Sequence, residues 1–115
     1  MPGYQEVLRH LAVNDRRLLT RLHGIDESMT WCRHFEPRMA ALVRVASLAA
    51  LGGSFETFRW TIEDALEAGA DEDEVVAVLL AIAPLMGVAR IASVVPMVAM
   101  ALDYDLDAAL ESPDV

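Results

Sequence analysis

The chain of 115 residues has no lysine and a single cysteine, Cys32, and aromatic residues make up only 6% of it. One thiol allows neither an intramolecular disulfide nor a zinc site built from several cysteines. The first residues lack the basic and then apolar pattern of a secretory signal peptide. We therefore expect a cytoplasmic protein that folds by burying apolar side chains, which make up 55% of the residues.

Positive charge is scarce, because nine arginines stand against 18 acidic residues and the net charge is −9. Residues 1–60 hold eight of the arginines and six acids, whereas residues 61–115 hold one arginine and twelve acids. Such a chain lacks the basic surface that nucleic acids and anionic lipids require, so we expect neither as a partner. The contrast between the halves suits subunit association and equally suits a solvated acidic surface.

Uncharged apolar runs long enough to cross a membrane are also missing. Residues 75–102 are almost continuously apolar, but Arg90 divides them into uncharged runs of 15 and 12 residues. A membrane-spanning helix needs about 20 residues. The stretch is better interpreted as buried helices of a soluble oligomer, and so large an apolar content in a small chain favours a homo-oligomer.

The apolar residues recur with helical spacing, and no segment alternates with period two for long enough to form a strand. The fold class is therefore all-α, a single-domain bundle of about six helices. The fifth helix is expected to be kinked or split around Pro96. The expected helices cover about residues 4–22, 37–51, 55–68, 71–85 and 88–102, and a short turn follows Asp105.

Local signals mark where these helices begin and end. Pro37 suits the first position of a helix, and Ser54 suits the cap of the next one. Gly69 follows the end of that helix. Asp71 and Glu74 have the spacing of a capping box, in which each side chain binds the other residue's backbone N–H.

The helix after Ser54 is the most informative one on a helical wheel. Arg59 and Thr61 flank its apolar face on opposite sides, and Trp60 lies nearly opposite that face. The indole ring either covers its own helix or anchors a subunit interface, where tryptophan is enriched. The apolar face consists of Phe55, Phe58, Ile62, Ala65 and Leu66.

Residues 36–111 resemble carboxymuconolactone decarboxylase domains, which belong to the alkyl-hydroperoxidase-D-like group. The strongest piece is ALEAGADEDEVVAVLLAIAP, which is similar to the family's A-L-x-A-G-A-T-x-E-E-I helix junction. The pieces VLRHLAVND and ALDYDLDAALE are similar to the ends of small members of the family. The resemblance implies an all-helical homo-oligomer, a trimer or a hexamer.

Peroxidase members of this group carry C-x-x-C-x-H-x-H, which falls here on Ser54, Thr57, Arg59 and Thr61. Thiol peroxidase chemistry needs a reactive thiolate and a second thiol, so we do not expect it in this chain. Members without the cysteines commonly keep a histidine at the position of Thr61. A threonine cannot exchange a proton near pH 7 as imidazole does.

Two arginines outside that motif are further candidates. Arg59 can pair with Glu63 four residues later on the same helix. Arg90 stands among apolar residues and is the only cation after residue 59. A buried guanidinium needs a carboxylate or several carbonyl groups as partners. For Arg90 the partner is either an acid of residues 61–74 or one at a subunit boundary, or the carboxylate of a ligand.

The number and spacing of the histidines and the cysteine argue against a metal site. Cys32 and His34 are close in sequence, but the other histidines, His10 and His23, are 13 residues apart and share no ligand spacing. We expect no metal and no cofactor.

Two functions remain for the expected domain, whose N-terminal helix and loop cover residues 1–35 and whose family-like core covers residues 36–111. One is a non-redox enzyme for a small carboxylated or lactone-like molecule, in which arginine orients the substrate and Glu63 moves a proton. The other is an oligomeric ligand-binding or scaffold protein without catalysis. The candidate catalytic residues are Arg59, Thr61 and Glu63, and the candidate ligand-binding residues are Arg90 and Trp60.

Overall fold

The computed structural model describes residues 3–13 and 35–111, which belong to two units, Met1–Glu36 and Pro37–Val115. The first unit contains α1 (Tyr4–Ala12), whose C-cap residue is Val13. The expected helix over residues 4–22 is therefore confirmed only in its first half. The loop with Cys32 and His34 lies outside the described residues.

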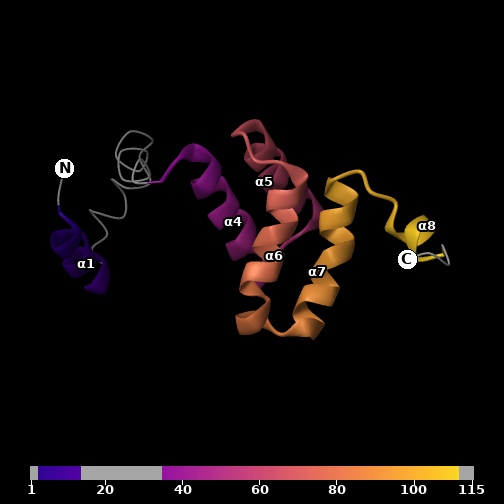
Figure 1. The fold of residues 1–115 in the computed structure, drawn as a ribbon. Helices are drawn as coiled ribbons and strands as arrows, with labels where there is room; N and C mark the ends of the chain where they lie inside the picture. Colours follow the sequence, from indigo (N-terminus) through magenta and orange to yellow (C-terminus); the bar gives the residue numbers. More distant parts are fainter. Residues whose placement is uncertain (1–2, 14–34, 112–115) are drawn as a thin grey trace. The chain divides into compact units, whose positions relative to one another are not determined.

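The second unit holds the rest of the described helices, and every described element is helical, as predicted. In Figure 1, α6 and α7 lie side by side and run in opposite directions, joined through Gly87, whose φ of 89° suits a residue without a Cβ. The helices are α4 (Pro37–Leu51), α5 (Phe55–Glu67), α6 (Glu72–Met86), α7 (Val88–Ala101) and α8 (Leu106–Leu110).

The predicted helix starts are confirmed in atomic detail. The Ser54 hydroxyl accepts a hydrogen bond of 3.2 Å from the backbone N–H of Thr57 and caps α5. Asp71 and Glu74 form the capping box of α6, with bonds of 2.8 and 3.2 Å between each carboxylate and the other residue's N–H. The Glu74 carboxylate also accepts a hydrogen bond of 2.6 Å from the Arg38 guanidinium. This bond connects the start of α4 to the start of α6.

Of the two outcomes expected at Pro96, a kink or a split of the fifth helix, the split is wrong, because α7 continues through Pro96 from Val88 to Ala101. A proline inside a helix leaves the carbonyl four residues earlier without its usual donor. Here that carbonyl belongs to Ala92. Both residues are exposed, so water can bind this carbonyl and the helix need not break.

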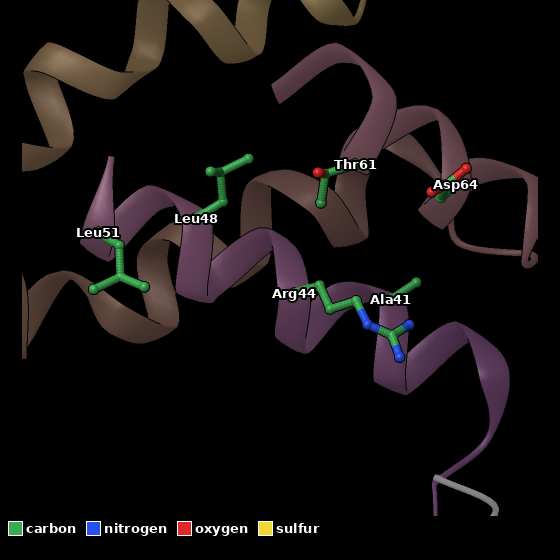
Figure 2. Close-up of a pocket in the computed structure, with 6 residues that line it drawn as sticks. All are labelled: Ala41, Arg44, Leu48, Leu51, Thr61 and Asp64. Carbon is green, nitrogen blue, oxygen red and sulfur yellow. The ribbon is translucent and has the colours of Figure 1, made fainter. Parts of the chain in front are cut away.

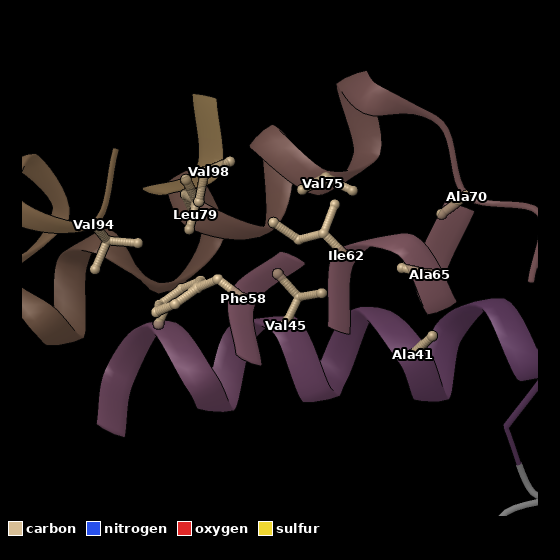
Figure 3. Close-up of a cluster of buried hydrophobic side chains, with 11 residues drawn as sticks. Ala41, Val45, Phe58, Ile62, Ala65, Ala70, Val75, Leu79, Val94 and Val98 are labelled. Atoms are coloured by element: carbon tan, nitrogen blue, oxygen red, sulfur yellow. The ribbon is translucent and has the colours of Figure 1, made fainter. Parts of the chain in front are cut away.

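The core is built where α4, α5, α6 and α7 meet (Figure 3). Its largest fully buried side chains are Val45, Phe58, Ile62 and Val75. The predicted apolar face of α5 is confirmed, since Phe58, Ile62 and Ala65 are all buried. The smaller or peripheral members of the core are Ala41, Ala49, Ala70, Leu79, Val94 and Val98.

Residues 75–102, by contrast, are only partly buried within a single chain. α6 buries Val75 and Leu79, while Leu85 near its end and Val88 at the start of α7 are 92% and 82% exposed. The expected burial of this stretch in an oligomer stays a prediction, because the structure describes a single chain. None of the described helices combines the length and the apolar character needed to cross a membrane.

Candidate functional site

A pocket of about 310 Å³ lies between α4 and α5. Figure 2 shows its lining side chains on these two helices, with the guanidinium of Arg44 on α4 and the carboxylate of Asp64 on α5. Its volume lies at the lower end of the range for small-molecule sites. The lining residues are Ala41, Arg44, Leu48, Leu51, Thr61 and Asp64.

Helical spacing explains why these residues meet. Arg44 and Leu48 are four residues apart and therefore share one face of α4, as Thr61 and Asp64, three apart, share one side of α5. Both helices bury their adjoining faces in the core through Val45 and Ile62. Packing of the two apolar faces thus brings the flanking polar side chains to the same pocket.

The polar groups of the pocket have complementary chemistry. Arg44 supplies a cation with several N–H donors, and the Asp64 carboxylate supplies acceptors. The Thr61 hydroxyl donates a hydrogen bond of 2.7 Å to the carbonyl of Thr57. Since a hydroxyl has one proton, Thr61 can offer a ligand only its lone pairs. The pocket therefore presents a cationic donor and two acceptors to a small molecule.

The turn between α4 and α5 approaches one of the residues that line this pocket. A Cβ on Gly53 would lie 2.8 Å from Cδ1 of Leu48, a lining residue. Ser54 and Thr57 have their hydroxyls 3.0 Å apart at the first turn of α5. These two residues lie at the start of α5. The residues of α5 that line the pocket are Thr61 and Asp64, one and two turns further along the helix.

Of the candidate residues on α5, only Thr61 lines the pocket. Arg59 and Glu63 form the expected pair, with Nε and Oε1 3.9 Å apart and both side chains about half exposed. Trp60 is 56% exposed. Residues two apart on a helix point about 200° apart, so Arg59 cannot face the pocket that Thr61 faces.

Arg90 contacts the end of α4. Its Nε donates to the carbonyl of Ala49 at 3.2 Å and its Nη2 to the carbonyl of Ala50 at 3.3 Å. These carbonyls lie in the last turn of α4, where the helix dipole favours a cation. The expected ion pair with an acid of residues 61–74 is therefore wrong, because all of these residues are described and none pairs with Arg90.

The same arginine explains part of the turn that follows α4. Gly52 has a φ of 89°, and a Cβ there would lie 2.8 Å from Nη2 of Arg90. Glycine at this position satisfies both the backbone conformation and the approach of the guanidinium. Arg90 thus holds the α4 end that carries Leu48 and Leu51 of the pocket.

Sequence reasoning missed Arg44 and Asp64, although the sequence contains a signal for each. Arg44 is a cation between Val43 and Val45 in an apolar helix, which is the property that singled out Arg90. Asp64 stands three residues after Thr61 and so shares its side of the helix. Their presence in one pocket depends on the contact between α4 and α5.

Comparison with known proteins gives one family. The model of the carboxymuconolactone decarboxylase family matches residues 17–99, well over half of the chain. The match begins earlier than the resemblance over residues 36–111 and ends before α8. No curated protein and no solved structure matches the chain significantly.

Proposed function

Because the chain belongs to the carboxymuconolactone decarboxylase family, we propose that it binds a small carboxylated or lactone-like molecule between α4 and α5 and acts on it by non-redox chemistry. The observation that supports this proposal most is the convergence of Arg44, Thr61 and Asp64 on one pocket. The only cysteine of the sequence, Cys32, cannot form the thiol pair of a peroxidase.

Each polar group of the pocket has a role in this proposal. The Arg44 guanidinium holds the ligand's carboxylate by paired N–H···O bonds. Asp64 accepts a proton from the bound molecule, or returns it, as a general base or acid. Thr61 accepts a hydrogen bond from a ligand hydroxyl, because its own proton is given to Thr57. Leu48 and Leu51 cover the apolar part of the ligand.

The proposal includes self-association into a homotrimer or homohexamer. It is supported by the large apolar side chains that a single chain leaves exposed, among them Leu80 and Leu85 on α6 and Val88 and Met100 on α7. A soluble monomer rarely exposes a large contiguous apolar surface. Trp60 on α5 has the exposure of an interface anchor. Light scattering at micromolar concentration tests this, and a 12.6 kDa particle contradicts it.

A second candidate function is a binding or scaffold protein without catalysis. It is favoured by Ser54 and Thr57, whose hydroxyls are engaged at the helix start, and by Arg59, which lies on the exposed side of α5. The two candidates share the ligand pocket and differ in turnover. Incubating the protein with each ligand and following the ligand by chromatography separates them.

Thermal melts with succinate, cis,cis-muconate and γ-butyrolactone test the proposed binding. A ligand that binds the folded state raises the melting temperature by mass action. We expect at least one carboxylate to raise the melting temperature of the parent but not that of the Arg44→Ala variant. Arg59→Ala is the control and should respond like the parent, because Arg59 lies outside the pocket. Circular dichroism of each variant checks that it is folded. An undiminished ligand response in a folded Arg44→Ala variant overturns the proposed role of the pocket.

A further inference from the structure

A second pocket, of about 360 Å³, lies between α6, α7 and the segment that follows α7. Among the described residues it shares no lining side chain with the pocket between α4 and α5. Seven of its nine lining residues are aliphatic, and the others are Glu72 and Tyr104. The aliphatic residues are Val76, Leu79, Val95, Val98, Ala99, Leu102 and Leu106.

The floor of this pocket is part of the hydrophobic core. Leu79 and Val98 are 4% and 3% exposed, and Figure 3 shows them side by side where α6 and α7 meet. Val76 and Tyr104, in contrast, are exposed at its wall. A concave site with a buried aliphatic floor removes hydrocarbon from water, which is worth roughly 25 cal/mol per Å² of apolar area.

The chain makes an unusual turn to close this pocket. Asp103 has a φ of 57°, in a region that residues other than glycine rarely adopt, and it is the one such residue in the described chain. The backbone N–H of Tyr104 donates a hydrogen bond of 2.8 Å to the carbonyl of Ala99, which holds the turn against α7. The turn brings Tyr104 and Leu106 to the wall of the pocket.

The charge around the pocket is negative. Glu72 lines it, and Asp71 and Asp73 flank Glu72 in the sequence. Asp103 and Asp105 flank Tyr104 in the same way. The only cation after residue 61, Arg90, donates to the carbonyls at the end of α4. An anionic ligand would be repelled here, whereas a cation would be attracted.

This charge also argues against a twofold contact with a second copy of the chain at the pocket. A twofold contact through the pocket would bring the same face of two chains together. The carboxylates of Glu72 and its neighbours would then face their own copies, and like charges in contact oppose association. A small cationic molecule meets no such repulsion.

We propose that this pocket binds a small apolar amine. The hydrocarbon part packs on Leu79, Val98 and Ala99, and the ammonium group lies at the Glu72 carboxylate, with the Tyr104 ring beside it. The site is independent of the proposed function, since it uses other residues and a ligand of the opposite charge. It gives the protein a second ligand that binds outside the pocket between α4 and α5.

The test uses n-octylamine, n-octanol and n-octanoate, which share a hydrocarbon chain and differ in the charge of the head group. Each displaces the neutral fluorescent probe N-phenyl-1-naphthylamine from the full-length protein. We expect octylamine to displace it at a concentration at least tenfold lower than octanoate, with octanol in between. Equal potency of octylamine and octanol, or stronger displacement by octanoate, overturns the proposal.

Two matched pairs of variants place the binding in this pocket. Val95→Phe fills the pocket and should abolish the probe signal, whereas Val88→Phe adds the same ring on the exposed side of α7 and should keep it. Glu72→Gln should reduce the preference for octylamine over octanol by at least fivefold, and Asp73→Asn should leave it nearly unchanged.

Three results would contradict this assignment. The first is unchanged probe binding in a folded Val95→Phe variant, and the second is an equal loss of amine preference in Glu72→Gln and Asp73→Asn. The third is probe binding that appears only when the protein is diluted to a monomer, which would mean that a second copy fills the pocket. The Arg44→Ala variant should respond to octylamine like the parent, which separates this result from the proposed function.

Discussion

The two pockets of this domain differ in the chemistry that they offer to a ligand. The pocket between α4 and α5 combines Arg44, Asp64 and a threonine hydroxyl, whereas the pocket beside α6 and α7 has an aliphatic floor and one carboxylate, Glu72. One hydrophobic core supports both. The comparison shows that a few polar residues flanking the apolar helix faces set the charge of the ligand that each pocket can accept.

A large-to-small substitution in the shared core should disrupt both pockets at once and have the largest effect on the free energy of unfolding. Phe58 and Ile62 are fully buried on α5, and α5 packs against α4 and α7. Phe58→Ala should lower the free energy of unfolding by about 3–5 kcal/mol, because it leaves a cavity. Urea denaturation measures this loss. A loss below about 1 kcal/mol would show that the core is not what holds the helices together.

Replacing Arg90 should affect only the pocket between α4 and α5. Arg90→Ala removes two hydrogen bonds from a charged donor to the carbonyls of Ala49 and Ala50. We expect the free energy of unfolding to fall by about 1–3 kcal/mol, less than the loss of a buried ion pair would cost. The octylamine response of the other pocket should remain.

A double-mutant cycle with Gly52→Ala checks this contact. The added Cβ would lie 2.8 Å from the guanidinium, so it displaces Arg90 as well as straining the turn. The two substitutions should therefore cost less together than the sum of their separate costs, because both break the same contact. Strict additivity would mean that Arg90 does not hold the end of α4.

Changing the cap of α6 should have a smaller effect, on the side of the second pocket. Asp71→Ala removes the carboxylate that accepts the N–H of Glu74, at a cost of about 1 kcal/mol. Asp73→Ala removes a neighbouring exposed carboxylate and should leave stability within about 0.5 kcal/mol of the parent. Urea denaturation of both variants measures the difference, and equal losses would contradict the capping role.

Removing Arg59 should affect neither pocket. Its pair with Glu63 spans 3.9 Å with both side chains about half exposed, and such helix pairs contribute a few tenths of a kcal/mol. Arg59→Ala should therefore unfold close to the parent in urea and bind the same ligands. Loss of carboxylate binding in this variant would mean that the carboxylate binds on the Arg59 side of α5 and not in the pocket.

The starts of α5 and α6 were predictable because their signals are local. Ser54, Asp71 and Glu74 cap helices through bonds that span three residues, so their spacing in the sequence is enough to find them. The apolar face of α5 was predictable for a similar reason, since helical periodicity alone selects Phe58 and Ile62.

The carbonyl acceptors of Arg90 and the pocket neighbours of Arg44 were not predictable in the same way. Arg90 binds backbone carbonyls about 40 residues away in the sequence, and a carbonyl leaves no trace in the identity of the residue that carries it. The approach of Arg44 to Thr61 and Asp64 depends on how α4 packs on α5. Pro96 stays inside α7, because the exposed carbonyl of Ala92 can be solvated.

The most direct test of the account crosses two ligands with two variants in thermal melts. The ligands are the most stabilising carboxylate of the panel and octylamine, and the variants are Arg44→Ala and Val95→Phe. The account predicts that Arg44→Ala loses only the carboxylate response and Val95→Phe loses only the amine response. If either variant lost both responses, or if both variants kept both, the claim of two pockets with opposite charge preference would be contradicted.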